Sequence, residues 1–205
     1  MREQDADVVA LEEANDRDAV ERLGRTLSMH AYWGEANSVY AVAWLSRRAA
    51  QARNHRLPVL DKTLFEIEVG DVRLFATHFS AGRTLADEPH RIEEMEAVLS
   101  VAGDADVLVG DFNSVHPTDE VGDAPPEERL EHVSRRPIDL ALERGFTDAY
   151  RALNHDRGWT YTTAHPWARL DYVFLAPRLR VRGCRVVTAA AGASDHFPVV
   201  AELAV

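Results

Sequence analysis

The chain has 205 residues, of which 46% are hydrophobic and 28% charged, the length and composition of a globular domain and not of a disordered chain. It has neither a run of ~20 apolar residues nor a second cysteine, which excludes an integral membrane protein, an intramolecular disulfide and a multi-cysteine zinc site. Acidic residues outnumber basic ones by 34 to 23, and the net charge of −11 argues against indiscriminate wrapping of nucleic acid or binding to an anionic membrane.

The first half of the chain alternates between strand-like and helix-like patterns. Residues 8–11 form an apolar run typical of a buried strand, and Asn15 or Asp16 is a suitable cap for a helix with Val20, Leu23 and Leu27 on one face. Residues 39–45 are also strand-like. Residues 65–69 and 72–76 alternate apolar and polar side chains around the turn Gly70-Asp71, which predicts a β-hairpin.

The second half continues the alternation. Pro89 predicts the first turn of a helix with Ile92, Met95 and Leu99 on one face, and residues 107–109 predict a buried strand. Residues 137–144 predict a helix that Gly145 ends. Four strand-like runs follow, at residues 159–163, 170–175, 181–188 and 197–203. With no linker between these segments, we expect one domain over residues 1–205, built of stacked sheets flanked by helices.

Polar residues stand in or directly after these strands five times. They are Glu12-Glu13, His78, Asp111 with Asn113, Asp171, and Asp195-His196. A carboxylate beside an apolar strand is costly unless it is paired or binds a cation, and five such placements are hard to explain as coincidences. Carboxylate oxygens with little sulfur favour Mg²⁺ or Mn²⁺.

The segments VVALEE, THFS, GDFNS, RLDYVF and SDHFP, in this order, resemble the endonuclease/exonuclease/phosphatase superfamily, which includes DNase I-like nucleases. The resemblance covers roughly residues 7–205. It implies an α/β fold, a four-layer αββα sandwich of two packed mixed β-sheets flanked by helices. It also implies hydrolysis of phosphoesters that depends on Mg²⁺ or Mn²⁺.

The resemblance also implies a role for each motif residue. Glu13 would bind the metal, with Asp195 close to the metal or its water. Asp111 would orient and deprotonate the attacking water. Asn113 would hold a phosphoryl oxygen or that water, and His78 would donate to a non-bridging oxygen. Asp171 would hold His196 in one tautomer and stabilise its protonated form.

Two further residues are expected near the substrate. Arg169 matches a position that often lies near the cleft in this family, although a salt bridge explains an arginine there equally well. Trp167 fits the wall of a substrate cleft, and the core face of a strand is at least as good an explanation.

One departure from the family concerns the amino-terminal end. Family members begin with a strand that carries an Asn near the metal, and we expect this chain to lack both. A start assigned too late, a truncated chain and a natural short form are the three explanations. Loss of that strand leaves unpaired backbone groups at a sheet edge, so we expect self-association and low activity. The alternative to an enzyme is a catalytically impaired or silent relative that acts as a binding or structural module.

Substrate and location are predicted only in outline. The acidic charge and the lack of an Arg/Lys-rich insertion place a small phosphodiester, a lipid or a sugar phosphate slightly ahead of DNA or RNA. We expect a cytoplasmic protein, or a secreted one if an amino-terminal segment is missing.

Overall fold

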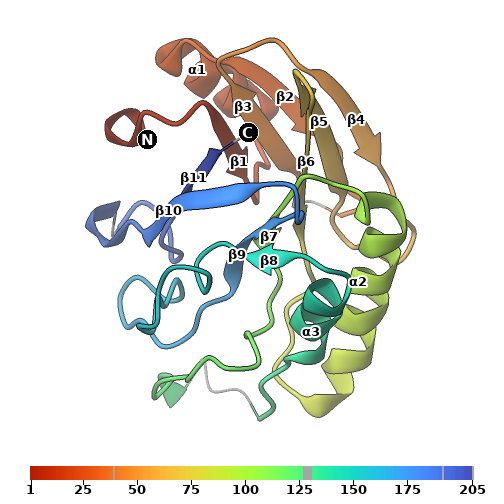
Figure 1. Ribbon diagram of the computed structural model, residues 1–205, viewed down its shortest axis with the longest axis vertical. Coiled ribbons are helices and arrows are strands. Elements are labelled where there is room, and N and C mark those ends of the chain that lie inside the picture. The colour runs from red at the N-terminus through yellow and green to blue at the C-terminus, as the bar shows by residue number, and fades with distance from the viewer. Residues whose placement is uncertain (39, 127–130, 191, 205) are drawn as a thin grey trace.

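The computed structural model describes residues 1–38, 40–126, 131–190 and 192–204 (Figure 1). The helices are α1 (Arg17–Leu27), α2 (Glu88–Ala102) and α3 (Arg136–Glu143), with 3₁₀ turns at Arg2–Gln4, Leu85–Asp87 and Thr188–Ala190. The strands are β1 (Val8–Leu11), β2 (His30–Gly34), β3 (Val42–Ser46), β4 (Gln51–His55), β5 (Leu64–Val69), β6 (Val72–His78), β7 (Val107–Asp111), β8 (Thr147–Asp148), β9 (Asp171–Leu175), β10 (Arg180–Val186) and β11 (Val199–Ala204).

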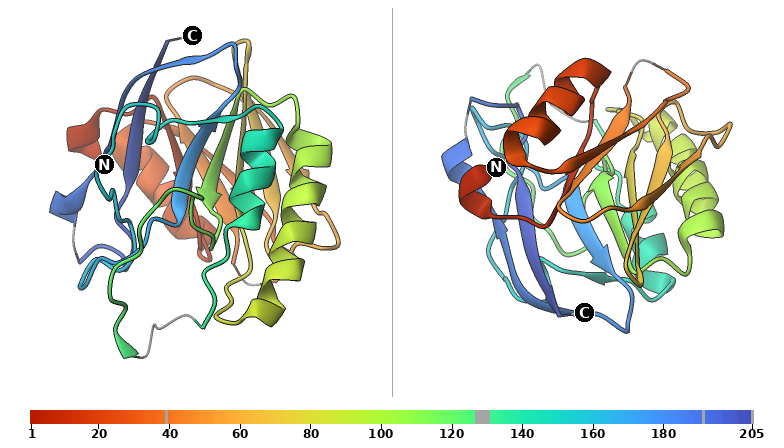
Figure 2. Two further views of the ribbon diagram at one scale, coloured as in Figure 1. Left: turned by 60° about the horizontal axis from the view of Figure 1, so that its bottom comes forward. Right: turned by 90° about the horizontal axis from the view of Figure 1, so that it is seen from above.

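Six of these strands form one continuous sheet in the order β4-β5-β6-β7-β9-β8. The pair β6–β7 is parallel and the other pairs are antiparallel, so the sheet is mixed. Helices α2 and α3 cover one face, where Phe75, Leu108 and Phe174 pack with Met95 and Ile138 (Figure 2). Because side chains alternate along a strand, the residues between them face the opposite layer.

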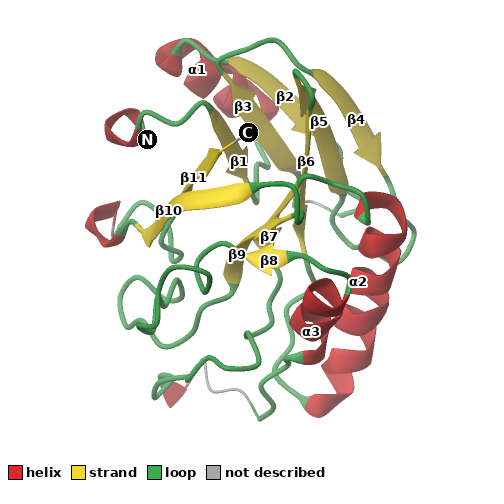
Figure 3. Ribbon diagram, in the orientation of Figure 1, coloured by secondary structure: helices red, strands yellow, loops and turns green. Residues whose placement is uncertain are grey.

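The opposite layer is divided. It consists of a three-stranded sheet, β1-β3-β2, and a separate hairpin, β10-β11 (Figure 3). Trp44, Ile67 and Val107 belong to the apolar core between this layer and the six-stranded sheet. Helix α1 covers the outer face of the three-stranded sheet, and Asp16 caps it by accepting a hydrogen bond from Ala19 N at 2.9 Å.

This arrangement confirms the predicted α/β fold with helices outside and sheets inside. Two details differ from the expectation. Only the six-stranded sheet is mixed, and the second layer is split: among the described residues, β1 pairs only with β3, and β11 only with β10. Both strands therefore present an unpaired edge.

Most predicted elements are confirmed within a few residues, including the hairpin at Gly70-Asp71 and the helices begun near Pro89 and Pro137. The strand predicted at 159–163 is wrong, because Tyr161 makes only isolated bridges to Ala168 and His196. The start of the strand predicted at 39–45 falls on residue 39, which lies outside the described residues. Strands β2, β4 and β8 were not predicted, since β4 (QARNH) is polar and β8 has two residues. No helix in the described ranges is long and apolar enough to cross a membrane.

Candidate active site

Three predicted residues lie in a row across three neighbouring strands. His78 at the end of β6 is the cross-strand partner of Asp111 at the end of β7, and Asp111 is the partner of Asp171 at the start of β9. Directly opposed residues of adjacent strands point to the same side of a sheet. The register of the ladder therefore brings the three side chains together at one edge of the six-stranded sheet.

The turn after β7 fixes the carboxylate of Asp111. Gly110 has φ of +149°, and a Cβ there would lie 1.9 Å from the carbonyl oxygen of Thr77, so only glycine fits between the strands. Asn113 adopts a left-handed conformation, with φ of +45°, and its backbone N–H donates to Asp111 Oδ1 at 2.8 Å. The motif GDFN is thus a tight turn that orients one buried acid.

His196 lies between the two aspartates. Its Nδ1 donates to Asp171 Oδ2 at 2.9 Å, and its Nε2 is 3.8 Å from Asp111 Oδ2. Burial alone would lower the pKa of His196, but the charges of Asp171, Asp111 and Asp195 and the hydrogen bond to Asp171 raise it to about 10. The imidazole is therefore held in its protonated form. The ring of Tyr161 packs against it, with the ring centroids 4.7 Å apart.

His78 has the opposite protonation. Burial, with the nearby positive charge of Lys62, lowers the pKa of His78 to about 3, so the ring is neutral at pH 7. Its Nε2 is 3.5 Å from Asp111 Oδ2. Among the described residues its buried Nδ1 has no hydrogen-bond partner.

Further acids surround this row in a cleft of about 280 Å³. Burial, and then the charges of Asp171 and Asp111, raise the pKa of Glu12 to about 8, and burial and Asp171 raise the pKa of Asp111 to about 7. Glu13 lines the cleft as an exposed residue with φ of +51°, and Asp195 lines it from the segment before β11. Sequence reasoning named Glu12 with Glu13 but gave it no role, although its charge interacts with both aspartates of the row.

The donor set suits a hard cation. Carboxylates that raise one another's pKa are relieved when a divalent ion neutralises them. Within the described part of the chain, however, no group of three or more His, Cys, Asp or Glu side chains is arranged to hold a metal ion directly. Mg²⁺ keeps several waters and needs only one or two carboxylates, so acids placed around a cleft fit a hydrated ion.

Arg169 corrects a prediction. Its side chain is 1% exposed and does not line the cleft. Its Nε donates to Asp119 at 2.8 Å and its Nη2 to Asp148 at 2.6 Å, and its guanidinium lies 4.4 Å from the centre of the Tyr172 ring. These contacts make Arg169 an internal ion-pair residue, because a buried guanidinium without acids would be costly.

Trp167 lines the cleft, yet it is 2% exposed and belongs to a small apolar cluster with Val115 and Leu170. It therefore forms the wall, and Tyr161, Gly82 and Arg83 complete the rim. The rim loop at Gly82 carried no sequence signal, because it contains neither a motif nor a strand end.

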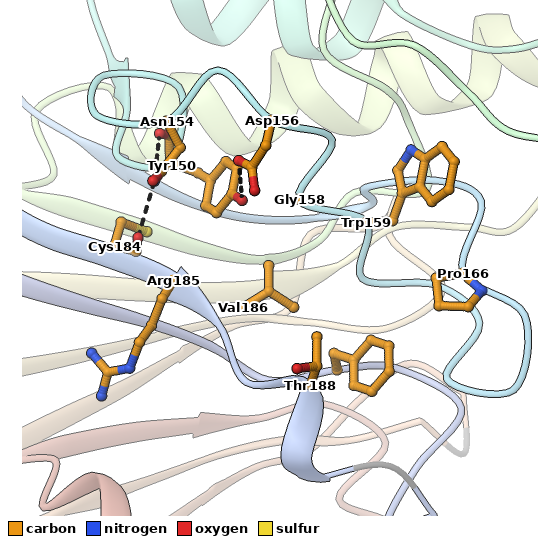
Figure 4. A pocket seen from close by; sticks show the side chains of 11 residues that line it. Tyr150, Asn154, Asp156, Gly158, Trp159, Pro166, Cys184, Arg185, Val186 and Thr188 are labelled. Carbon is orange, nitrogen blue, oxygen red and sulfur yellow. Dashed lines mark hydrogen bonds between the residues drawn. The ribbon is translucent and has the colours of Figure 1, made fainter.

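A second cavity, of about 390 Å³, lies between the loop at residues 150–159 and β10 (Figure 4). Its polar groups are used inside the protein. The amide of Asn154 donates to Tyr150 O and Cys184 O at 3.1 and 3.0 Å, and the hydroxyl of Tyr150 donates to Asp156 at 2.7 Å. Burial raises the pKa of the Cys184 thiol to about 12, which makes it unreactive. The cavity holds none of the predicted site residues.

Comparison with known proteins places the chain in a family. The model of the endonuclease/exonuclease/phosphatase family matches residues 1–196. Among curated proteins there is no significant match.

Solved structures share the fold. The 3′ phosphatase NExo from Neisseria, solved with a product DNA hairpin, is 23% identical, with a TM-score of 0.80 over 97% of this chain and 89% of that one. An AP endonuclease from Archaeoglobus fulgidus is 18% identical, with a TM-score of 0.83 over 100% and 91%. A family protein from Beutenbergia cavernae is 24% identical, with a TM-score of 0.81 over 98% of this chain and 63% of that one. At these identities the likeness extends to the fold alone.

Proposed function

The chain belongs to the endonuclease/exonuclease/phosphatase family, and from that premise we propose that it hydrolyses phosphate esters with the help of Mg²⁺ or Mn²⁺. The observation that carries the proposal is the row of His78, Asp111 and Asp171 with His196 between the two aspartates. A neutral histidine, a buried acid and a protonated histidine within one cleft supply both an acceptor for protons and donors for developing negative charge.

Asp111 is the proposed base. Its pKa of about 7 lets it accept a proton from a water that attacks phosphorus, and its position is held by the turn to Asn113. As the new P–O bond forms, the bond to the leaving oxygen breaks. Protonated His196, oriented by Asp171, donates to a phosphoryl oxygen and stabilises the added charge.

Glu13, Glu12 and Asp195 are the proposed ligands of the cation or of its waters. A bound divalent ion would polarise the phosphoryl group and neutralise the acids of the cleft. His78, which lines the cleft in its neutral form, is the proposed contact of a non-bridging oxygen.

The substrate remains a choice between two classes. The net charge of −11 favours a small phosphodiester, a lipid or a sugar phosphate. Similar structures solved as a phosphatase with a DNA hairpin and as an AP endonuclease support a nucleic acid. Parallel assays of plasmid nicking, abasic-site cleavage, sphingomyelin hydrolysis and phosphate release from inositol phosphates decide between them.

The general reaction is tested with bis-p-nitrophenyl phosphate. We expect turnover with Mg²⁺ or Mn²⁺ that EDTA abolishes and that Asp111→Ala reduces to background. Turnover that survives both changes would show that this cleft is not the active site.

A silent relative that acts as a binding module is the second candidate. Two observations favour it: Glu13 is exposed, and the second layer, next to whose strands β1 and β11 the proposed cation ligands lie, is split. Cation binding without turnover on any substrate of the panel would establish it.

A further inference from the structure

The only lysine of the chain is buried beside the cleft. Lys62 is 6% exposed and, with Arg91 and Arg169, is one of three Lys or Arg side chains in the described ranges that are less than a tenth exposed. Burying an ammonium group costs free energy unless the group is well paired. Its position just before β5 therefore calls for an explanation from its contacts.

The side chain of Lys62 bonds to a backbone carbonyl just after β6, the strand that ends at His78. Lys62 Nζ donates to Phe79 O at 3.1 Å. The same carbonyl accepts from Asn113 Nδ2 at 3.0 Å, and the N–H of Phe79 donates to Asp111 O at 2.9 Å. The backbone N–H and C=O of Phe79, the residue after His78, thus bond to Asp111 and Asn113, the proposed base and its neighbour.

The charge of Lys62 acts on two buried acids. Its charge favours the ionised carboxylate at both Asp111 and Glu94. The ring of Tyr40 covers the ammonium, with 5.7 Å between Nζ and the ring centroid. The ring centroids of Tyr40 and His78 are 6.4 Å apart, so Tyr40 is a neighbour of both Lys62 and His78.

We propose that Lys62 is a positioning residue of the active site, whose ammonium holds the Phe79 carbonyl so that Asn113, which donates to the same carbonyl, keeps its orientation toward the phosphoryl group. This inference rests on the proposed phosphoester hydrolysis. Asn113 shares its acceptor with Lys62, so loss of the ammonium leaves one donor where two had fixed the carbonyl.

A double-mutant cycle tests this link. We expect Lys62→Met to lower kcat about tenfold with KM changed less than about twofold, because a misplaced group costs the chemical step more than binding. Asn113→Ala and the double variant should then differ by less than about twofold, since two groups that act through one carbonyl are not additive. Lys62→Arg, which keeps a donor and the charge, should recover most of kcat.

The matched control is Arg25→Met, which removes the same charge from an exposed position on α1. It should leave kcat unchanged and be additive with Asn113→Ala. Additive effects of Lys62→Met and Asn113→Ala would overturn the inference, as would wild-type kcat in Lys62→Met. Should Lys62→Met fail to fold, Lys62→Gln takes its place in the same cycle.

A measurement without turnover separates this inference from the proposed function. The side-chain amide signals of Asn113, identified in ¹⁵N NMR spectra by their loss in Asn113→Ala, should shift or broaden in Lys62→Met and stay in place in Arg25→Met. Unmoved signals would refute the positioning role. If the wild-type protein is inactive but the Asn113 signals shift in Lys62→Met, only the proposed reaction is refuted.

Discussion

The two sides of the cleft are built differently. On one side, His78, Asp111 and Asp171 are cross-strand partners in the continuous six-stranded sheet. On the other side, Glu13 and Asp195 lie outside the ladders, on segments next to β1 and β11, whose sheets are not joined. A hydrogen-bonded register holds His78, the proposed base Asp111, and Asp171, which orients His196; His196 itself lies beside Asp195 in the segment before β11. Loop segments hold the groups proposed to bind the cation, and a cation is able to draw in ligands that do not already converge.

The largest expected effect comes from Asp111, in the row of cross-strand partners. Asp111→Asn should lower kcat about 10³-fold, since it removes the base while keeping the shape of the turn. Hydrolysis of bis-p-nitrophenyl phosphate at saturating Mn²⁺ measures it. Asp104→Asn, the same change at an acid whose side chain is 78% exposed, serves as the control and should be silent.

Glu13→Gln provides the contrast within the same assay. Its loss should be smaller, about tenfold, and should shrink as the Mn²⁺ concentration rises, because a weakened ligand is compensated by mass action. Rescue of Asp111→Asn by Mn²⁺, or no rescue of Glu13→Gln, would contradict the division between the two sides.

The second effect concerns protonation. His196 has its pKa raised to about 10, largely through Asp171, so its pairing adds stability that is fully present below pH 6.5 and is lost as the pH rises through 10. Asp171→Asn removes the negative charge of Asp171 that raises the pKa of His196. We expect kcat to fall about 10²-fold and the alkaline limb of the kcat profile to move to lower pH.

NMR titration of His196 checks the cause directly. Its imidazole signals should titrate at a lower pH in Asp171→Asn than in the wild type. An unchanged titration, with a large loss of kcat, would assign Asp171 a role other than holding the proton on His196.

The third effect concerns the folding stability that is lost when the clustered acids ionise and no cation is bound. Glu12 has its pKa raised from 4.5 to about 8, so in EDTA the folded state loses stability as the pH rises between these values. Glu12→Gln should raise the free energy of unfolding at pH 8 by about 1–2 kcal/mol and leave it nearly unchanged at pH 5. Urea unfolding at both pH values measures the difference. A lower stability of Glu12→Gln at pH 8 would contradict it.

The sequence predicted the paired side better than the cation side. Apolar alternation and the motif GDFN located β6, β7 and β9, and their register then placed His78, Asp111 and Asp171 together. Glu12 was named with Glu13 but given no role, because the side-chain directions at the end of a strand depend on φ, and Glu13 turns outward at +51°. Arg169 was misplaced because its partners, Asp119 and Asp148, lie 50 and 21 residues away along the chain. Lys62 has no motif, and its role depends on a carbonyl 17 residues further along.

The smallest expected effect tests the split layer itself. The unpaired edges of β1 and β11 offer backbone donors and acceptors to another molecule, so we expect weak dimerisation that increases with protein concentration. Val200 alternates with Val199 and Ala201, which pack on the core, so its side chain points to the other face of β11. Val200→Lys places a charge on this edge strand and should shift sedimentation profiles toward the monomer.

Leu85→Lys, at an apolar residue 64% exposed on a 3₁₀ turn, controls for general surface hydrophobicity and should dimerise like the wild type. If the wild-type protein stays monomeric at the highest concentration, these edges are protected in solution. The contrast between the continuous six-stranded sheet and the split second layer would then matter only at the cleft.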